Sequence, residues 1–144
     1  MVASDLDAIA AIEQAEYTHP WTRGNFSDSL EAGYHCWVVE RGGVLAGYTV
    51  VMVAAGEAHL LNLTVAAPWQ RKGLGRALLA FMLKLARDYG GQKIFLEVRA
   101  SNAGARSLYA SAGFTEVTVR RDYYPAGPGR EDAVVLGLML EKRE

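Results

Sequence analysis

Basic residues and glycines gather in a short stretch in the middle of the chain, where a predicted strand ends and a predicted helix begins. Gly73 and Gly75 let the backbone come close to a ligand. The free N–H groups of a first helical turn then point at an anion, with support from the helix dipole. Arg71, Lys72 and Arg76 add positive charge at the same point. The stretch therefore predicts a site for a pyrophosphate; the alternative is an ordinary loop with a solvated basic rim.

The spacing of these residues distinguishes the loop from two common phosphate-binding motifs. A P-loop has four residues between its glycines and then Lys-Ser or Lys-Thr, and the chain lacks this pattern. A dinucleotide fingerprint needs a third glycine, and Leu78 stands at that position. The form that is present, Gln-x-x-Gly-x-Gly from Gln70 to Gly75, resembles the coenzyme A loop of the GCN5-related N-acetyltransferase (GNAT) superfamily.

Two further residues are candidates for proton transfer. Glu97 lies within the apolar strand from Ile94 to Val98, and a carboxylate that is buried without a partner is often neutralised or functional. It is a candidate general base, unless it pairs with a neighbour such as Arg99 or faces solvent at the strand end. Tyr109 could donate a proton to a leaving thiolate, although a single aromatic residue on a helix more often packs in the core.

Six segments strengthen the resemblance and narrow it to one family. They resemble the RimI family, the bacterial N-terminal alanine acetyltransferases of the eighteenth small-subunit ribosomal protein, over nearly the whole chain. The segments are Ile12 to Gln14, His19 to Trp21, Leu96 to Ala103, Leu108 to Phe114, Arg120 to Pro125 and Gly129 to Ala133. One departure is visible at the start, where only Met1 to Ala3 precede Ser4. Either the sequence starts late, or the edge strand that usually opens this fold is short or missing.

The resemblance implies a mechanism and a set of contacts. The N-terminal amine of the acceptor attacks the thioester of acetyl-coenzyme A directly, with Glu97 as general base, alone or through a water, and Tyr109 as general acid. Acetyl-coenzyme A is the cosubstrate, and its pantetheine arm pairs with the strand at Leu61 to Val65. The implied coenzyme contacts are Leu63, Thr64, Val65, Gln70, Arg71, Lys72, Gly73, Leu74, Gly75, Arg76 and Asn102. For Asn102 the residues alone also predict a helix cap.

Aromatic residues on two segments are candidate walls of a groove for the acceptor peptide. Trp21 and Phe26 would form one wall, and Tyr123 and Tyr124 the other, with ordinary packing as the alternative. The acidic residues Glu13, Glu16 and Asp122 could attract a basic peptide. For Glu13 and Glu16, a solvated helix face is the stronger interpretation. Cys36 is predicted to be core filler, and no metal site is expected because the histidines lack ligand spacing.

The elements that must position these residues are read from hydrophobic periodicity and turn signals. The order is two helices, three strands, helix, strand, helix and two strands, which predicts one mixed α/β domain over residues 1–144. The resemblance implies a mostly antiparallel central sheet flanked by helices. Helical crossovers on both sides of the strand at Lys93 to Val98 predict that its neighbours run parallel to it. Gly42-Gly43 is a hairpin turn, and Pro125 to Gly129 is a loop.

Composition limits the partners and the compartment. The net charge is −1, so no overall field would attract nucleic acid or an anionic membrane. The single cysteine and the lack of a signal peptide pattern at the start predict a cytoplasmic protein. Two rival functions stay open: an acetyltransferase of the same fold that acts on lysine or a small amine, and a non-catalytic module that binds acyl-coenzyme A.

Overall fold

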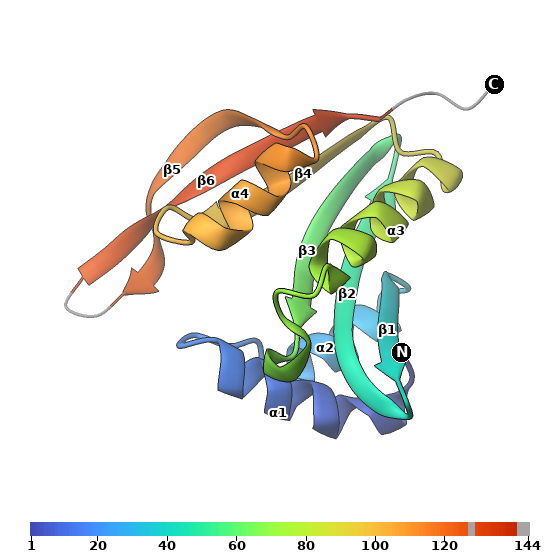
Figure 1. The fold of residues 1–144 in the computed structure, drawn as a ribbon. Coiled ribbons are helices and arrows are strands. Elements are labelled where there is room, and N and C mark those ends of the chain that lie inside the picture. The colour runs from blue at the N-terminus through green and yellow to red at the C-terminus, as the bar shows by residue number, and fades with distance from the viewer. Residues whose placement is uncertain (127–128, 141–144) are drawn as a thin grey trace. The chain divides into compact units, whose positions relative to one another are not determined.

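The computed structural model describes residues 1–126 and 129–140. Figure 1 shows the helices and strands in chain order. They are the 3-10 helix Ala3–Asp5, α1 Leu6–Glu16, α2 Arg23–Glu31, β1 His35–Arg41, β2 Val44–Ala54, β3 Glu57–Val65, the 3-10 helix Ala67–Trp69, α3 Leu74–Asp88, β4 Lys93–Arg99, α4 Ala103–Ser111, β5 Thr115–Ala126 and β6 Gly129–Met139. The predicted element order is confirmed. No helix within the described residues is long and apolar enough to cross a membrane.

Local signals explain where several elements begin and end. The Thr22 hydroxyl accepts from the Asn25 N–H at 3.1 Å and caps α2. The turn between β1 and β2 is formed by Gly42 and Gly43, whose φ angles of 60° and 80° favour glycine. The predicted loop from Pro125 to Gly129 is wrong for its outer residues, because Pro125 and Ala126 belong to β5 and Gly129 belongs to β6. Residues 127–128 lie outside the described part.

The strands form one six-stranded sheet in the order β1-β2-β3-β4-β6-β5, with β3 and β4 parallel. β1 is antiparallel to β2, and β6 is antiparallel to both β4 and β5. The mostly antiparallel sheet is therefore confirmed. The first strand of the described residues is β1, which follows α1 and α2 in the chain.

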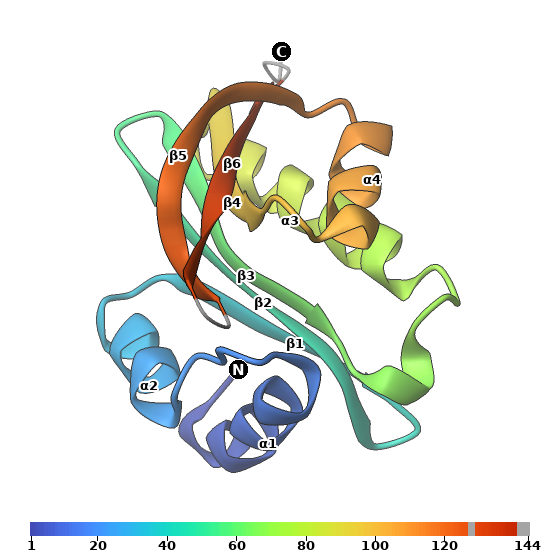
Figure 2. The ribbon, with the colours of Figure 1, turned by 90° about the vertical axis from the view of Figure 1, so that its left-hand side faces the viewer.

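One expectation about the sheet is wrong. β4 has a parallel neighbour on one side only, because β6 lies between β4 and β5 (Figure 2). The physical reason is burial: β6 carries the buried residues Ala133, Val134 and Leu136, whereas most of β5 is exposed. β6, the more apolar strand of the β5–β6 hairpin, therefore lies next to β4. The connection from β4 through α4 leads to β5 at the edge of the sheet.

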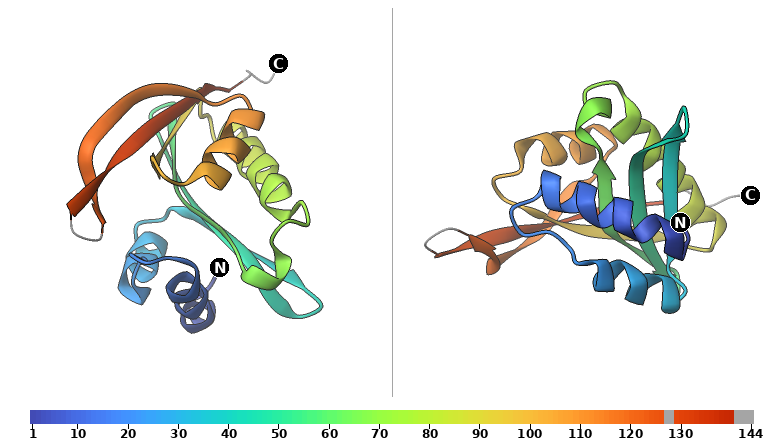
Figure 3. Two further views of the ribbon diagram at one scale, coloured as in Figure 1. Left: turned by 60° about the vertical axis from the view of Figure 1, so that its left-hand side comes forward. Right: turned by 90° about the horizontal axis from the view of Figure 1, so that it is seen from below.

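The chain divides into two compact units. The first contains Met1–Met52 and Leu61–Lys84, and the second contains Val53–Leu60 and Leu85–Glu144. In the first unit α1 and α2 lie side by side (Figure 3), and their apolar faces pack against one face of β2. The buried cluster that joins them is formed by Leu6, Ile9, Phe26, Tyr48 and Val50. Because strand side chains alternate, Gly47 faces the other way, toward Leu78 of α3.

In the second unit β4 carries the buried residues Ile94, Leu96 and Val98 on one face, and α4 adds Tyr109 to this unit's core. Tyr109 meets Phe114 edge to face, with ring centroids 5.6 Å apart. The opposite face of β4, which carries Glu97, is more open. This alternation decides which strand residues are available for chemistry.

Candidate active site

The basic loop of the first unit ends at a helix N-terminus, as predicted. The first intrahelical bond of α3 runs from the Ala77 N–H to the Gly73 carbonyl at 3.1 Å, so the N–H groups of residues 74–76 have no acceptor within the helix. Gly73 has a φ of 83°, in the region that favours glycine, and the backbone of Arg71 has a φ of 61° in the same region. Non-glycine residues in this region are uncommon and concentrate at functional sites.

The side chains of this loop divide into two groups. Arg71, Lys72 and Arg76 are exposed, and the Lys72 ammonium lies 5.6 Å from the centre of the Trp69 ring. Their charges, together with the donors of the first helical turn, fit a group that carries phosphates. Gln70 behaves differently, because its amide donates to the Val65 carbonyl at 2.8 Å and to the Glu16 carboxylate at 2.7 Å. This side chain therefore ties the loop to the end of β3.

The end of β3 presents three predicted coenzyme contacts with different surroundings. Thr64 is buried, and its hydroxyl bonds to the Asn62 side chain and to the Tyr17 hydroxyl, each at 2.8 Å. Leu63 and Val65 are half-buried. The Thr64 side chain is thus engaged inside the protein, and any ligand contact at this residue would have to use its backbone.

Glu97 is not buried in the second unit. Its side chain is 32% exposed, and it forms an ion pair with Arg120 of β5 at 2.8 Å. Of the two alternatives for this residue, the structure therefore agrees with a paired and partly exposed carboxylate, because the strand alternates and Leu96 and Val98 take the buried face. The partner differs from the neighbour considered: Arg99 bonds instead to Glu131 at 3.3 Å. The Glu97 carboxylate in turn raises the pKa of Arg120.

The β5–β6 hairpin brings two tyrosines to this ion pair. The Arg120 guanidinium lies 4.2 Å from the centre of the Tyr123 ring, and the Tyr123 and Tyr124 rings meet edge to face at 5.0 Å. Arg99 lies 4.5 Å from the Tyr124 ring centre. Burial, with a further effect from the Glu97 charge, raises the pKa of Tyr124 to about 12. One connected cluster of charges and rings therefore surrounds the candidate base.

A bulge in β5 sets the position of these tyrosines. The register with β6 shifts between Arg120 and Tyr124, and Asp122 has a φ of 52°. Arg130 donates to the Asp122 and Tyr123 carbonyls at 2.6 and 2.8 Å, and Asp132 accepts from the Asp122 N–H at 2.9 Å. Arg120, Arg130 and Asp132 are residues to which sequence reasoning gave no role; they lie in segments that carry the family resemblance, but their partners depend on strand register.

The remaining predicted residues of the second unit have structural contacts. The Asn102 side chain accepts from the Ala105 N–H at 3.2 Å, so its predicted cap role is confirmed. Tyr109 is 8% exposed and packs on Phe114, as in the packing interpretation. Their roles toward a coenzyme or a leaving group stay predictions.

Two expectations for the first unit are wrong. Phe26 is fully buried in the core, so it forms no groove wall, while Trp21 is half-buried and lies 5.1 Å from its ring. Glu13 is 2% exposed rather than part of a solvated helix face. Its turn of α1 faces β2 and β3, where polar side chains meet it.

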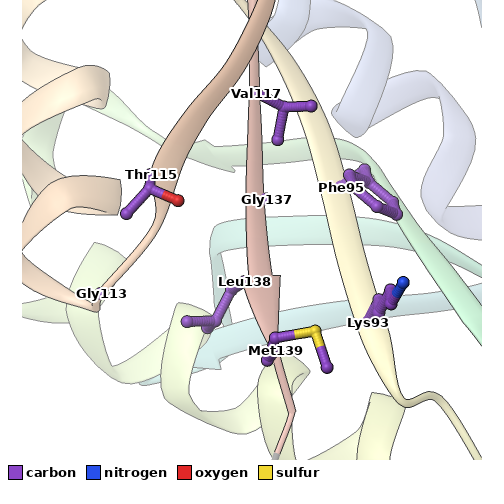
Figure 4. Close-up of a pocket in the computed structure, with 8 residues that line it drawn as sticks. All are labelled: Lys93, Phe95, Gly113, Thr115, Val117, Gly137, Leu138 and Met139. Atoms are coloured by element: carbon purple, nitrogen blue, oxygen red, sulfur yellow. The ribbon is translucent and has the colours of Figure 1, made fainter.

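A cavity of about 440 Å³ opens on the second unit (Figure 4). Its lining residues are Lys93, Phe95, Gly113, Thr115, Val117, Gly137, Leu138 and Met139. The lining is mostly apolar and contains none of the residues that the sequence predicts for catalysis or binding. Within the described ranges, no group of three or more His, Cys, Asp or Glu residues is placed to hold a metal ion.

Comparisons with known proteins agree along the chain. The Acetyltransferase (GNAT) family matches residues 6–114. The chain is 41% identical over 137 residues to the ribosomal protein bS18 alanine N-acetyltransferase of Escherichia coli K12. This alignment covers 95% of the chain and 93% of the relative. The crystal structure of the ribosomal-protein-S18-alanine N-acetyltransferase from Escherichia coli has a TM-score of 0.92 and 38% identity, covering 100% of this chain and 93% of that chain.

A more distant structure resembles the fold alone. It is yncA, a putative acetyltransferase from Salmonella typhimurium with its cofactor acetyl-CoA, with a TM-score of 0.83 and 23% identity. The match covers 100% of this chain and 93% of that chain.

Proposed function

Because this chain belongs to the acetyltransferase (GNAT) family, we propose that it transfers an acetyl group from acetyl-coenzyme A to the N-terminal alanine of ribosomal protein bS18. The observation that supports this choice of substrate is the 41% identity, over 95% of the chain, to an enzyme named for this reaction. The proposal treats residues 1–144 as one catalytic domain. It also places the enzyme in the cytoplasm, where ribosomal proteins are made.

The first unit supports coenzyme binding. Coenzyme A carries a pyrophosphate, and the start of α3 offers the N–H groups of residues 74–76 with three exposed cationic side chains beside them. The glycine at 73 and the backbone of Arg71 bend the loop so that it leads into the helix. The half-buried residues Leu63 and Val65 would offer backbone groups to the pantetheine arm, as an added strand does.

The second unit supports proton transfer. Acetyl-coenzyme A supplies an activated acetyl thioester, and the acceptor amine has an ordinary pKa of about 8, so modest base assistance is sufficient at neutral pH. Glu97 would take the proton from the α-ammonium, directly or through a water, and Tyr109 would give a proton to the departing thiolate. Arg120 holds the Glu97 carboxylate before the acceptor arrives, so an incoming ammonium would compete with a guanidinium for it.

The test is a mass-resolved transfer assay with acetyl-coenzyme A. The acceptor is a short peptide that begins Ala-Arg-Tyr-Phe, the start that the resemblance implies, and its copy with a blocked N-terminus is the control. One acetyl group on the α-amine, absent from the blocked copy, is the expected result. Transfer to lysine or to a small amine alone would replace the proposed substrate. Coenzyme binding without transfer to any acceptor would indicate a binding module.

The catalytic assignment has its own variant pair. Glu97→Gln removes the charge with little change in shape and should lower kcat by about 10²–10⁴-fold, with an unchanged Kd for the coenzyme. Glu116→Gln, at an exposed position of β5, is the matched control and should leave both values unaltered. Wild-type turnover in Glu97→Gln would remove its role as the base.

A further inference from the structure

Glu13 is a buried acid for which the proposed reaction has no use. It lies on α1 with 2% exposure, beside the apolar cluster that contains Ile9 and Tyr48. A carboxylate in such a place is costly unless hydrogen-bond donors surround it, and an apolar side chain of similar size would avoid that cost. The residue therefore needs an explanation beyond core packing.

Donors from three segments of the first unit meet this carboxylate. The Tyr48 hydroxyl of β2 donates to Oε1 at 2.8 Å, and the backbone N–H of Trp21 donates to Oε2 at 3.0 Å. The Asn62 amide of β3 lies 3.2 Å from Oε1 and 3.4 Å from Oε2. Burial and the Glu13 charge raise the pKa of Tyr48 well above its usual range, so the phenol remains a donor.

The bonds extend to the strand that we assign to the coenzyme. The side-chain oxygen Oδ1 of Asn62 accepts from the Thr64 hydroxyl at 2.8 Å, and that hydroxyl also meets the hydroxyl of Tyr17 at 2.8 Å. Tyr17 follows the last turn of α1. Glu13 and Tyr17 thus connect the same helix to β3 at two points, and Glu13 alone also holds the segment that follows, at Trp21.

The two ends of this network have different proposed partners. Trp21 belongs to the segment between α1 and α2, which is a predicted wall for the acceptor peptide. Asn62 precedes Leu63, whose backbone is a predicted coenzyme contact. A single carboxylate with two oxygens determines how far the Trp21 backbone lies from β3, because both donors converge on it.

We infer that Glu13 is a positioning residue that holds the Trp21 segment against β3 in the arrangement that acceptor binding requires. The inference rests on the proposed function, since it deepens the recognition of the acceptor. It gives Glu13 no contact with the reacting atoms. Its loss should therefore affect the peptide KM more than kcat or coenzyme affinity.

The test compares two variants of the full chain that disturb the same network. Glu13→Gln keeps the size of the side chain but replaces one acceptor oxygen by an NH2 group. In either orientation of the amide this NH2 group faces another donor, the Trp21 N–H if it replaces Oε2 or the Asn62 amide if it replaces Oε1. Tyr48→Phe removes one donor and leaves the bonds to Trp21 and Asn62 in place. Both variants should lower the melting temperature, because each loses a buried hydrogen bond.

Only Glu13→Gln should raise the peptide KM, by about tenfold or more, with kcat and the Kd for acetyl-coenzyme A near wild-type values. Hydrogen–deuterium exchange at the Trp21 amide should also become faster in Glu13→Gln and stay slow in Tyr48→Phe. Equal KM values in the two variants, or unaltered exchange at Trp21, would overturn the inference.

The exchange measurement also separates this inference from the proposed function. If wild-type protein does not acetylate the alanine peptide, the proposed substrate fails. The exchange at Trp21 then still decides whether Glu13 holds this segment, and KM is measured with the amine that the wild-type protein does acetylate. Slow exchange at Trp21 in Glu13→Gln would refute the positioning role with any acceptor.

Discussion

The substitution Gly47→Ala should displace β3, the strand that we assign to the pantetheine arm of the coenzyme. A Cβ at this position of β2 would lie 2.8 Å from the Thr64 carbonyl oxygen and 3.7 Å from both the Val65 Cα and the Leu78 Cδ2. Carbon–oxygen contacts between neighbouring strands are about 3.3–3.6 Å, so β3 would have to move by about half an ångström or more at Thr64. The clashing atom belongs to the backbone, so no side-chain rotation relieves it.

The magnitude of this change follows from packing and from the unfolded chain. Overpacking of a close-packed site costs about 1–3 kcal/mol, and a rigid backbone neighbour places Gly47→Ala in the upper part of that range. The loss of glycine entropy in the unfolded chain offsets about 0.4–1 kcal/mol. A net loss of about 1–2 kcal/mol remains. For a chain of 144 residues the unfolding entropy is about 0.3 kcal/mol/K, so the melting temperature should fall by about 3–7 °C.

A second glycine provides the matched control. A Cβ at Gly137 of β6 would meet only side chains, at 2.9 Å from the Val117 Cγ2 and 3.1 Å from two ring carbons of Phe95. Val117 is 55% exposed and can rotate away. Gly137→Ala should therefore cost less stability than Gly47→Ala, and it leaves the Leu63–Val65 backbone where it is.

The assay combines thermal unfolding with calorimetric titration of acetyl-coenzyme A. We expect Gly47→Ala to lower the melting temperature and to weaken coenzyme binding, and Gly137→Ala to leave binding unaltered. A normal melting temperature in Gly47→Ala would refute the packing argument. A lower melting temperature with wild-type coenzyme affinity would refute the assignment of the coenzyme to β3.

Three further changes test separate parts of the structure. Asn102→Ala removes the cap on the Ala105 N–H and should lower the free energy of unfolding in urea by about 1 kcal/mol, whereas Asn102→Asp should retain it. The pKa of Glu131 lies below its ordinary value of 4.5 because Ser101 donates to its carboxylate, so its stabilisation is complete above pH 4.5 and is lost as the pH falls through the lowered pKa. Urea unfolding should therefore show Glu131→Gln less stable than wild type at pH 7, with a difference that shrinks in acid; a constant difference would contradict the ionic contribution. Gly75→Trp should abolish coenzyme binding in calorimetry by filling the space before the first turn of α3, and an unaltered Kd would exclude the phosphate site.

Local chemistry made much of this fold predictable. The hairpin at Gly42-Gly43, the cap at Asn102 and the helix that begins after Gly73 each depend on residues within one or two turns of each other. The same is true of the basic loop, whose glycines and charges lie within one segment. These features were predicted correctly because short-range steric effects and hydrogen bonds determine them, independently of the rest of the chain.

The partners of the candidate catalytic and positioning residues were decided by tertiary structure. Glu97 pairs with Arg120 rather than Arg99 because β6 enters the sheet between β4 and β5, and a bulge then sets the register of β5. Glu13 is buried because its turn of α1 faces Tyr48 and Asn62, which lie 35 and 49 residues away in the chain. Sequence alone determined the fold family, the elements and the residue types available for chemistry. Strand order and burial determined their partners, because those depend on which distant segments pack together and exclude water.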